Sequence, residues 1–112
     1  MLHHSGSVEV ICGSMFSGKT EELIRRLRRA MIARQKIQVF KPVIDARYNA
    51  TRVTSHSGAD FEALPINNSE EIISNLLEDT TVVAIDEAQF FDDGIVQIVQ
   101  QLADRGMRVL VA

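Results

Sequence analysis

The sequence predicts an α/β fold, in which a mainly parallel sheet is flanked by helices. Two observations support this prediction. Short apolar runs typical of strands alternate along the 112 residues with segments whose apolar residues recur every three or four positions. Strands that alternate with helices are typical of parallel sheets with right-handed crossovers. In addition, the run Thr81–Ile85 is continuously β-branched or apolar, as a strand buried on both faces requires.

The first half of the chain contains two predicted strands and one predicted helix. The first strand covers Ser7–Cys12, and the helix begins near Lys19 and ends near Arg34. A second strand at Ile37–Phe40 is stopped by Pro42, since proline lacks a backbone N–H donor. The helix has the i, i+3, i+4 spacing of a buried stripe. That stripe is Leu23, Ile24, Leu27, Ala30 and Met31.

A long polar connection, residues 42–60, follows the second strand and contains a possible short strand at Val53–Ser55. Loops of this length in a compact domain are usually functional or disordered. Phe61–Leu64 is a further short strand candidate. Asn68, with Glu71 three residues later, predicts a capped helix start. That helix would turn Ile72, Ile73, Leu76 and Leu77 inward.

The last third of the chain continues the alternation of strands and helices. After Thr81–Ile85, Gly94 precedes a helix, and Gly106 is a plausible left-handed cap at its end. The final strand is Arg108–Ala112. The predicted inward stripe of this helix is Ile95, Ile98, Val99 and Leu102. We expect residues 1–6 to be a flexible tail. Because the chain stops inside an apparent strand, we expect residues 7–112 to be an incomplete domain.

Composition indicates a soluble protein of a reducing compartment. Hydrophobic residues make up 46% of the chain, yet no apolar stretch approaches the roughly 18 residues of a membrane span. The N-terminus lacks the apolar core of a signal peptide. The single cysteine, Cys12, excludes an internal disulfide and is predicted to be a small core residue. We therefore expect a cytoplasmic protein without a membrane partner.

The charge is distributed unevenly along the chain. Residues 1–41 hold eight Lys and Arg against three Glu, whereas residues 42–112 hold four Arg against twelve Asp and Glu. Arginines concentrated on one helix can bind an anionic partner such as nucleic acid. We favour a solvated helix face, because no aromatic residues for base stacking lie between them. The cluster is Arg25, Arg26, Arg28, Arg29 and Arg34.

The segment Gly13–Thr20 reads G-S-M-F-S-G-K-T, a full match to the phosphate-binding pattern GxxxxGK[ST]. It lies between a predicted strand and a predicted helix, where its backbone N–H groups can surround phosphates. Lys19 is placed to reach the β- and γ-phosphates, and the Thr20 hydroxyl to hold Mg²⁺. The predicted phosphate-binding residues are Gly13, Ser14, Met15, Phe16, Ser17, Gly18, Lys19 and Thr20.

Two adjacent acids, Asp86 and Glu87, end the strand predicted at Thr81–Ile85. In P-loop enzymes an Asp at the end of a neighbouring strand commonly holds the Mg²⁺ shell, and Asp86 fits that role. Glu87 can instead accept a proton from an attacking oxygen. Side chains alternate along a strand, so the two acids need not point the same way. One acid can then serve the metal while the other meets the nucleophile.

Together these motifs closely resemble those of the zinc-containing thymidine kinases of bacteria and animal cytosol, over about residues 7–112. The segment Asp86–Phe91, reading D-E-A-Q-F-F, matches, as do F-K-P at 40–42, D-A-R-Y at 45–48 and S-H-S at 55–57. The resemblance implies a P-loop NTPase-type, RecA-like domain that ends here before the family's zinc-bearing lasso. It implies ATP and thymidine as substrates, Mg²⁺ with the ATP, zinc only beyond residue 112, and a homotetramer.

The resemblance also implies residue roles. Glu87 would be the general base for the thymidine 5′-hydroxyl. Met15 and Phe90 would line the thymine pocket, and Asp45 and Arg47 would lie near the phosphates. The ATP site would also include Asp86, Glu87, Ala88 and Gln89.

Two other classes remain as alternatives. In a P-loop motor ATPase of the helicase or recombinase type, Glu87 would direct water rather than an alcohol. A non-catalytic nucleotide-binding module is a third possibility, against which the intact Lys19, Thr20, Asp86 and Glu87 argue. The segments Phe90–Phe91 and Asp45–Tyr48 favour the kinase.

Overall fold

A computed structural model describes residues 6–13, 18–43, 52–54 and 60–112. Within them a five-stranded sheet has the order β1-β7-β6-β2-β5, and each neighbouring pair is parallel. A separate antiparallel pair joins β3 and β4. The elements are β1 (Ser7–Val10), α1 (Lys19–Ile32), β2 (Ile37–Pro42), β3 (Arg52–Thr54), β4 (Asp60–Glu62), β5 (Leu64–Ile66), α2 (Glu70–Ser74), β6 (Val82–Ile85), the 3₁₀ turn η1 (Ala88–Phe90), α3 (Ile95–Asp104) and β7 (Arg108–Val111).

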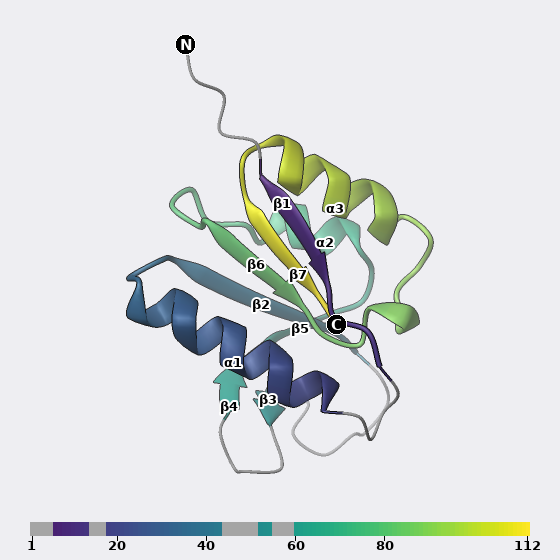
Figure 1. Ribbon diagram of the computed structural model, residues 1–112. Coiled ribbons are helices and arrows are strands. Elements are labelled where there is room, and N and C mark those ends of the chain that lie inside the picture. The colour runs from purple at the N-terminus through teal and green to yellow at the C-terminus, as the bar shows by residue number, and fades with distance from the viewer. Residues whose placement is uncertain (1–5, 14–17, 44–51, 55–59) are drawn as a thin grey trace.

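Helices cover both faces of the parallel sheet, which confirms the predicted α/β class. Figure 1 shows α1 on one face, with the β3–β4 pair beside it, and α2 and α3 on the other. The strand β6 lies in the middle, and all four of its residues are buried. Val82 and Ala84 pack in the cluster on the α1 side, while Val83 and Ile85 pack in the cluster on the α3 side. A strand covered on both faces has to be apolar throughout, as the sequence predicted.

Parallel pairing places the glycine-rich loop and the acidic pair at the same edge of the sheet, where the strands end. The chain enters the glycine-rich loop after β1 and the acidic pair after β6, and both are carboxyl ends of parallel strands. Only β7 lies between these two strands. Backbone hydrogen bonds extend the ladder at this edge, from Ile11 N to Val111 O at 2.7 Å and from Ala88 N to Ala112 O at 3.0 Å. Ligands of open α/β sheets bind beyond these strand ends.

Three side chains predicted to be buried are exposed. Met31 is 56% exposed because the last turn of α1 presents only Ala30 to the sheet. Leu77 is 61% exposed because α2 ends at Ser74 and Leu77 lies in the connection that follows. Cys12 is exposed because β1 ends two residues before it, at the edge of the described sheet.

Several other observed boundaries lie close to the predicted ones but do not coincide with them. The segment expected as one strand, Phe61–Leu64, divides at Ala63 into β4 and β5, which belong to different sheets. The strand expected at Val53–Ser55 is β3, and Ser55 lies outside the described residues. Gly6, expected in the tail, donates its N–H to Ala103 O at 2.9 Å. A β-carbon there would stand 2.1 Å from Met107 O, so this close approach requires glycine.

Both predicted helix boundaries near Gly106 and Asn68 are confirmed. Gly106 has φ 92°, and its N–H donates to Ala103 O while Met107 N–H donates to Leu102 O, which is the hydrogen-bond pattern of a Schellman cap. The Asn68 side-chain oxygen accepts the Glu71 N–H at 3.2 Å. These contacts satisfy backbone groups that helix ends leave without intrahelical partners.

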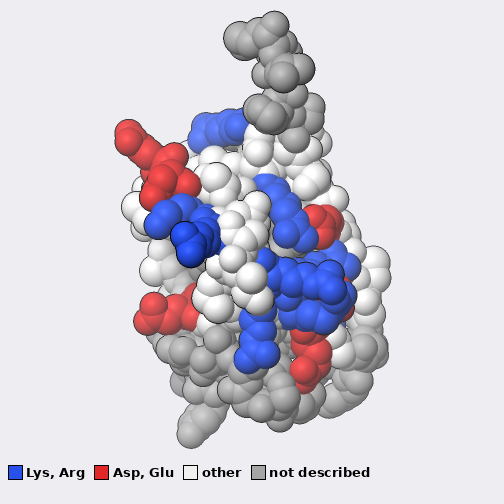
Figure 2. Space-filling view, turned by 60° about the vertical axis from the view of Figure 1, so that its left-hand side comes forward, with Lys and Arg blue, Asp and Glu red and all other residues white. Residues whose placement is uncertain are grey.

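A chain of ion pairs attaches α1 to strands β1 and β7 of the sheet. Glu9 on β1 bonds Arg108 on β7 and Arg26 on α1, the latter at 3.0 Å. Arg26 also bonds Glu22 at 2.7 Å, and Glu22 bonds Arg25 at 2.6 Å. In Figure 2 basic side chains form a patch with acidic ones next to it. Arg25 and Arg26, two of the five arginines in the cluster, are thus paired with carboxylates.

These ion pairs predict that acid destabilises the protein in a defined pH range. Hydrogen bonds from Arg108 lower the pKa of Glu9, and those from Arg25 and Arg26 lower the pKa of Glu22 from 4.5 to about 2. A carboxylate whose pKa is lower in the folded state than in the unfolded state stabilises the folded state. This stabilisation is fully present above the pKa of the unfolded state, and it is lost as the pH falls through the pKa of the folded state. The free energy of unfolding should therefore fall as the pH drops from 4.5 towards 2.

Urea unfolding of the full-length protein at a series of pH values checks this expectation. Glu9→Gln should cost about 1 kcal/mol or less near neutral pH, as partly exposed ion pairs do, and should flatten the acid dependence. Glu78→Gln, at an exposed position in the connection after α2, is the matched control and should leave the curve unchanged. An acid dependence equal in Glu9→Gln and wild type would show that these pairs contribute nothing.

Candidate nucleotide-binding site

The glycine-rich loop joins α1 through a residue with a left-handed backbone. Gly18 has φ 84° and ψ 19° and is the N-cap of α1, and its carbonyl accepts the Glu22 N–H at 2.9 Å. A β-carbon at Gly18 would meet no atom within 4 Å, so the backbone angle, not lack of space, requires glycine here. Gly13, the first residue of the loop, also has a positive φ of 145°. The four predicted loop residues between them, Ser14, Met15, Phe16 and Ser17, lie outside the described residues.

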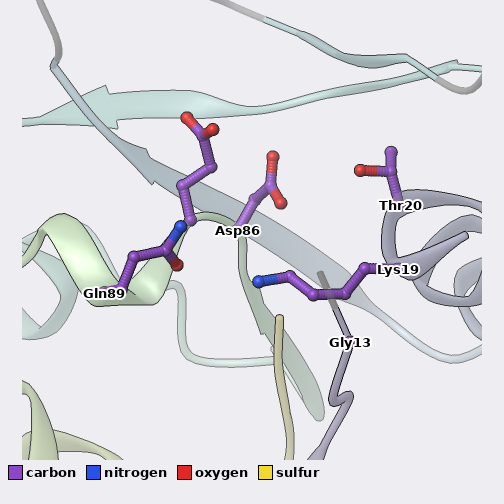
Figure 3. Close-up of a pocket in the computed structure, with 6 residues that line it drawn as sticks. Gly13, Lys19, Thr20, Asp86 and Gln89 are labelled. Carbon is purple, nitrogen blue, oxygen red and sulfur yellow. The ribbon is translucent and has the colours of Figure 1, made fainter. Parts of the chain in front are cut away.

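A cavity of about 410 Å³ lies at the carboxyl edge of the sheet. It brings together the start of α1 and the end of β6, which are separated by more than 60 residues in the sequence. In Figure 3 the Lys19 side chain extends from α1 towards the end of β6, and Thr20 lies on the same helical turn. The lining residues are Gly13, Lys19, Thr20, Asp86, Glu87 and Gln89, and all six belong to the set predicted from the sequence.

The sheet holds Asp86 in the lining of this cavity. Its N–H donates to Phe40 O at 2.9 Å, which extends the pairing of β6 with β2 by one residue. Only 7% of its surface is exposed. Burial raises the pKa of Asp86, and the nearby negative charge of Glu87 adds to this, while the positive charges of Lys41 and Lys19 oppose it. A carboxylate in such a place gains from a bound cation, which would offset the cost of burying its charge.

Glu87 adopts a left-handed backbone that the sequence did not predict. Its φ of 52° and ψ of 45° end the strand and begin η1. Non-glycine residues rarely adopt these angles, which cost of order 1 to 3 kcal/mol and cluster at functional sites. The turn interrupts the alternation of a strand, so Asp86 and Glu87 line the same cavity. No local sequence signal marks a glutamate for this conformation.

The structure describes some of the other predicted site residues and not the rest. Gln89 lines the cavity, and Ala88 lies in η1 with its N–H bonded to Ala112 O. Phe90 ends η1 and is 50% exposed. Met15, Asp45 and Arg47 lie outside the described residues.

The residues of the cavity fit a magnesium ion bound together with phosphate. Mg²⁺ prefers oxygen ligands and usually takes one or two protein groups, with phosphate and water completing its shell. Thr20 and Asp86 supply a hydroxyl and a carboxylate to the same cavity. Within the described part of the chain, no group of three or more His, Cys, Asp or Glu side chains could hold a metal ion by itself.

The structure has a parallel sheet flanked by helices. A lysine and a threonine at the start of the helix after the glycine-rich loop share a cavity with two acids. These features define a P-loop nucleotide-binding protein. The model of the family described as "Thymidine kinase" matches residues 6–112. The chain therefore belongs to the thymidine kinase family.

Curated relatives agree with the family match. The chain is 60% identical over 111 residues to a thymidine kinase of Bdellovibrio bacteriovorus, an alignment that covers 99% of this chain and 54% of the relative. It is also 60% identical over 107 residues to the thymidine kinases of two Porphyromonas gingivalis strains, covering 96% of this chain and 52% of each relative. The chain thus spans about half the length of the curated relatives it matches. Among its described helices, none is long and apolar enough to cross a membrane.

Proposed function

We propose that the full-length protein transfers the γ-phosphoryl group of ATP to the 5′-hydroxyl of thymidine, which gives dTMP and ADP. The observation that carries this proposal is the cavity in which Lys19 and Thr20 of α1 face Asp86 and Glu87 after β6. Membership in the thymidine kinase family supports the choice of reaction. The name of the relatives supports thymidine as the acceptor.

Phosphoryl transfer asks the protein mainly for alignment and neutralisation of charge. The Lys19 ammonium group and the loop N–H groups would hold the phosphates, with Thr20 and Asp86 as ligands of Mg²⁺, which supplies further positive charge to the phosphate oxygens. Glu87 would accept the proton of the thymidine 5′-hydroxyl. The 5′-oxygen would then bond to the γ-phosphorus of ATP while the bond between that phosphorus and the leaving oxygen of ADP breaks. The place of Glu87 beside Asp86, across the cavity from α1, supports this assignment.

The acceptor side of the site is proposed from residue type and family. Phe90, which follows Glu87 by three residues and exposes half of its surface, would contact the base. Met15 would line the same thymine pocket, and Asp45 and Arg47 would lie near the phosphates. Ala88 and Gln89 would border the ATP site.

We also propose a cytoplasmic homotetramer with no nucleic-acid or membrane partner. Zinc would bind beyond residue 112, because residues 1–112 contain one cysteine and structural zinc sites use four ligands.

An assay of the full-length protein with ATP, Mg²⁺ and thymidine tests the proposal. We expect dTMP and ADP to form in equal amounts, and formation to stop when thymidine is omitted. The motor alternative predicts ADP and inorganic phosphate without dTMP, stimulated by single-stranded DNA. Phosphate release of that kind, with no dTMP detected, would contradict the kinase assignment.

A further inference from the structure

The sheet places a second lysine, Lys41, beside the magnesium-binding acid. Phe40 pairs with Ile85 in the parallel ladder between β2 and β6, and the bond from Asp86 N to Phe40 O continues it by one residue. Lys41, which follows Phe40, therefore lies next to Asp86 on the neighbouring strand. This proximity comes from strand register, and no sequence motif indicates it.

The alternation of side chains puts Lys41 and Asp86 on the same face of the sheet. Phe40 and Ile85 both pack in the cluster on the α3 side. Val39 and Ala84 both pack in the cluster on the α1 side. Since successive strand residues point to opposite faces, the side chain of Lys41 lies on the α1 side, where the phosphate-binding loop joins the helix.

Burial strengthens the interaction between these two charges. Asp86 is 7% exposed and Lys41 is half-buried, so water screens the pair less than it would at the surface. Both lysines bring positive charge near Asp86, Lys41 from the neighbouring strand and Lys19 from the lining of the same cavity. Lys19 lines the cavity, whereas Lys41 does not contribute to its described lining. Asp86 thus has one lysine in the same cavity lining and another on the neighbouring strand.

We propose that Lys41 is a positioning residue that acts through Asp86: it stays with this carboxylate and so leaves Lys19 available for the phosphates of the nucleotide. In the empty site both ammonium groups attract Asp86. When a nucleotide binds, Lys19 is needed on the phosphates, and Lys41 remains as the counter-charge of Asp86. Without Lys41, binding would have to move Lys19 away from an acid that no longer has a second cation nearby.

A double-mutant cycle in the full-length protein tests this proposal, which rests on the proposed nucleotide site. The probe is ADP without Mg²⁺, titrated by calorimetry, so the readout depends on neither the metal nor activity. Lys41→Met should weaken ADP binding about tenfold, a typical coupling within one charge network. Lys41→Arg should bind nearly as wild type does, and Lys36→Met, which removes an exposed lysine just before β2, is the matched control and should have no effect.

The decisive comparison is the effect of Lys41→Met in the Asp86→Asn background. If Lys41 acts through Asp86, the further loss there should be less than about twofold. An equal loss in both backgrounds would mean that Lys41 contacts phosphate directly, and would overturn the proposal, as would an unchanged affinity of Lys41→Met. Lys41→Gln serves as a second neutral variant if Lys41→Met does not fold.

The same titrations separate this proposal from the proposed function. If the wild-type protein binds ADP and Lys19→Ala binds it more weakly, while both neutral Lys41 variants bind normally, only the role of Lys41 fails. If the wild-type protein binds ADP neither with nor without Mg²⁺, the nucleotide site itself fails, and the role of Lys41 fails with it.

Discussion

Replacing Glu87 by Gln should lower the turnover of thymidine by about 10²- to 10⁴-fold, the usual loss when a general base is removed. Glutamine keeps the size and hydrogen-bonding capacity of the side chain but cannot accept the proton of the 5′-hydroxyl. ATP affinity should change little, because Lys19 and Asp86 remain in the cavity. Steady-state formation of dTMP and a separate titration of ATP measure the two effects in the full-length protein.

Asp86→Asn is the informative comparison for Glu87→Gln. The proposed magnesium ligand and the proposed proton acceptor line the same cavity, and their losses should differ in kind. Asp86→Asn should raise the Mg²⁺ concentration needed for turnover and weaken nucleotide binding, whereas excess Mg²⁺ should not restore Glu87→Gln. Glu78→Gln, at an exposed site, should behave as wild type. Near-normal turnover of Glu87→Gln, or its rescue by Mg²⁺, would move the catalytic role to another carboxylate, with Asp45 the first candidate.

Replacing Lys19 by Ala should weaken ATP binding and lower turnover together. Hydrogen bonds to charged groups contribute about 1.5–3 kcal/mol, so ATP affinity should fall by roughly 10- to 150-fold. The side chain extends into the cavity from the first turn of α1 (Figure 3), so its removal takes away a positive charge without touching the core. Titration of ATP and steady-state kinetics of the full-length variant measure the two losses.

Lys36→Ala is the matched control for Lys19→Ala, because it removes an exposed lysine beyond the far end of α1. The control should leave binding and turnover unchanged. Unfolding by urea should show that both variants remain folded. If Lys19→Ala phosphorylated thymidine at the wild-type rate, the glycine-rich loop would not be the phosphate site.

The sequence by itself determined the class of fold and most of the cavity. Periodicity is a local property, so α1, α3 and the buried β6 could be predicted from the spacing of their apolar residues. The glycine-rich loop and the acidic pair could be predicted because phosphate and Mg²⁺ binding require particular residue types at fixed spacing. Five of the six residues that line the cavity had been selected in this way, and the sixth, Gln89, had been selected from the family resemblance.

Tertiary structure decided what depends on contacts between distant segments. Ser7 pairs with Arg108, and this pairing leaves β1 at an edge of the described sheet, with Cys12 exposed beyond its end. The left-handed turn at Glu87, which aims two adjacent acids into one cavity, has no local signal. The position of Lys41 beside Asp86 follows from the register of β2 against β6. Register and strand order are set by which faces can be buried together in the whole sheet, and the spacing of residues within one segment does not encode that choice.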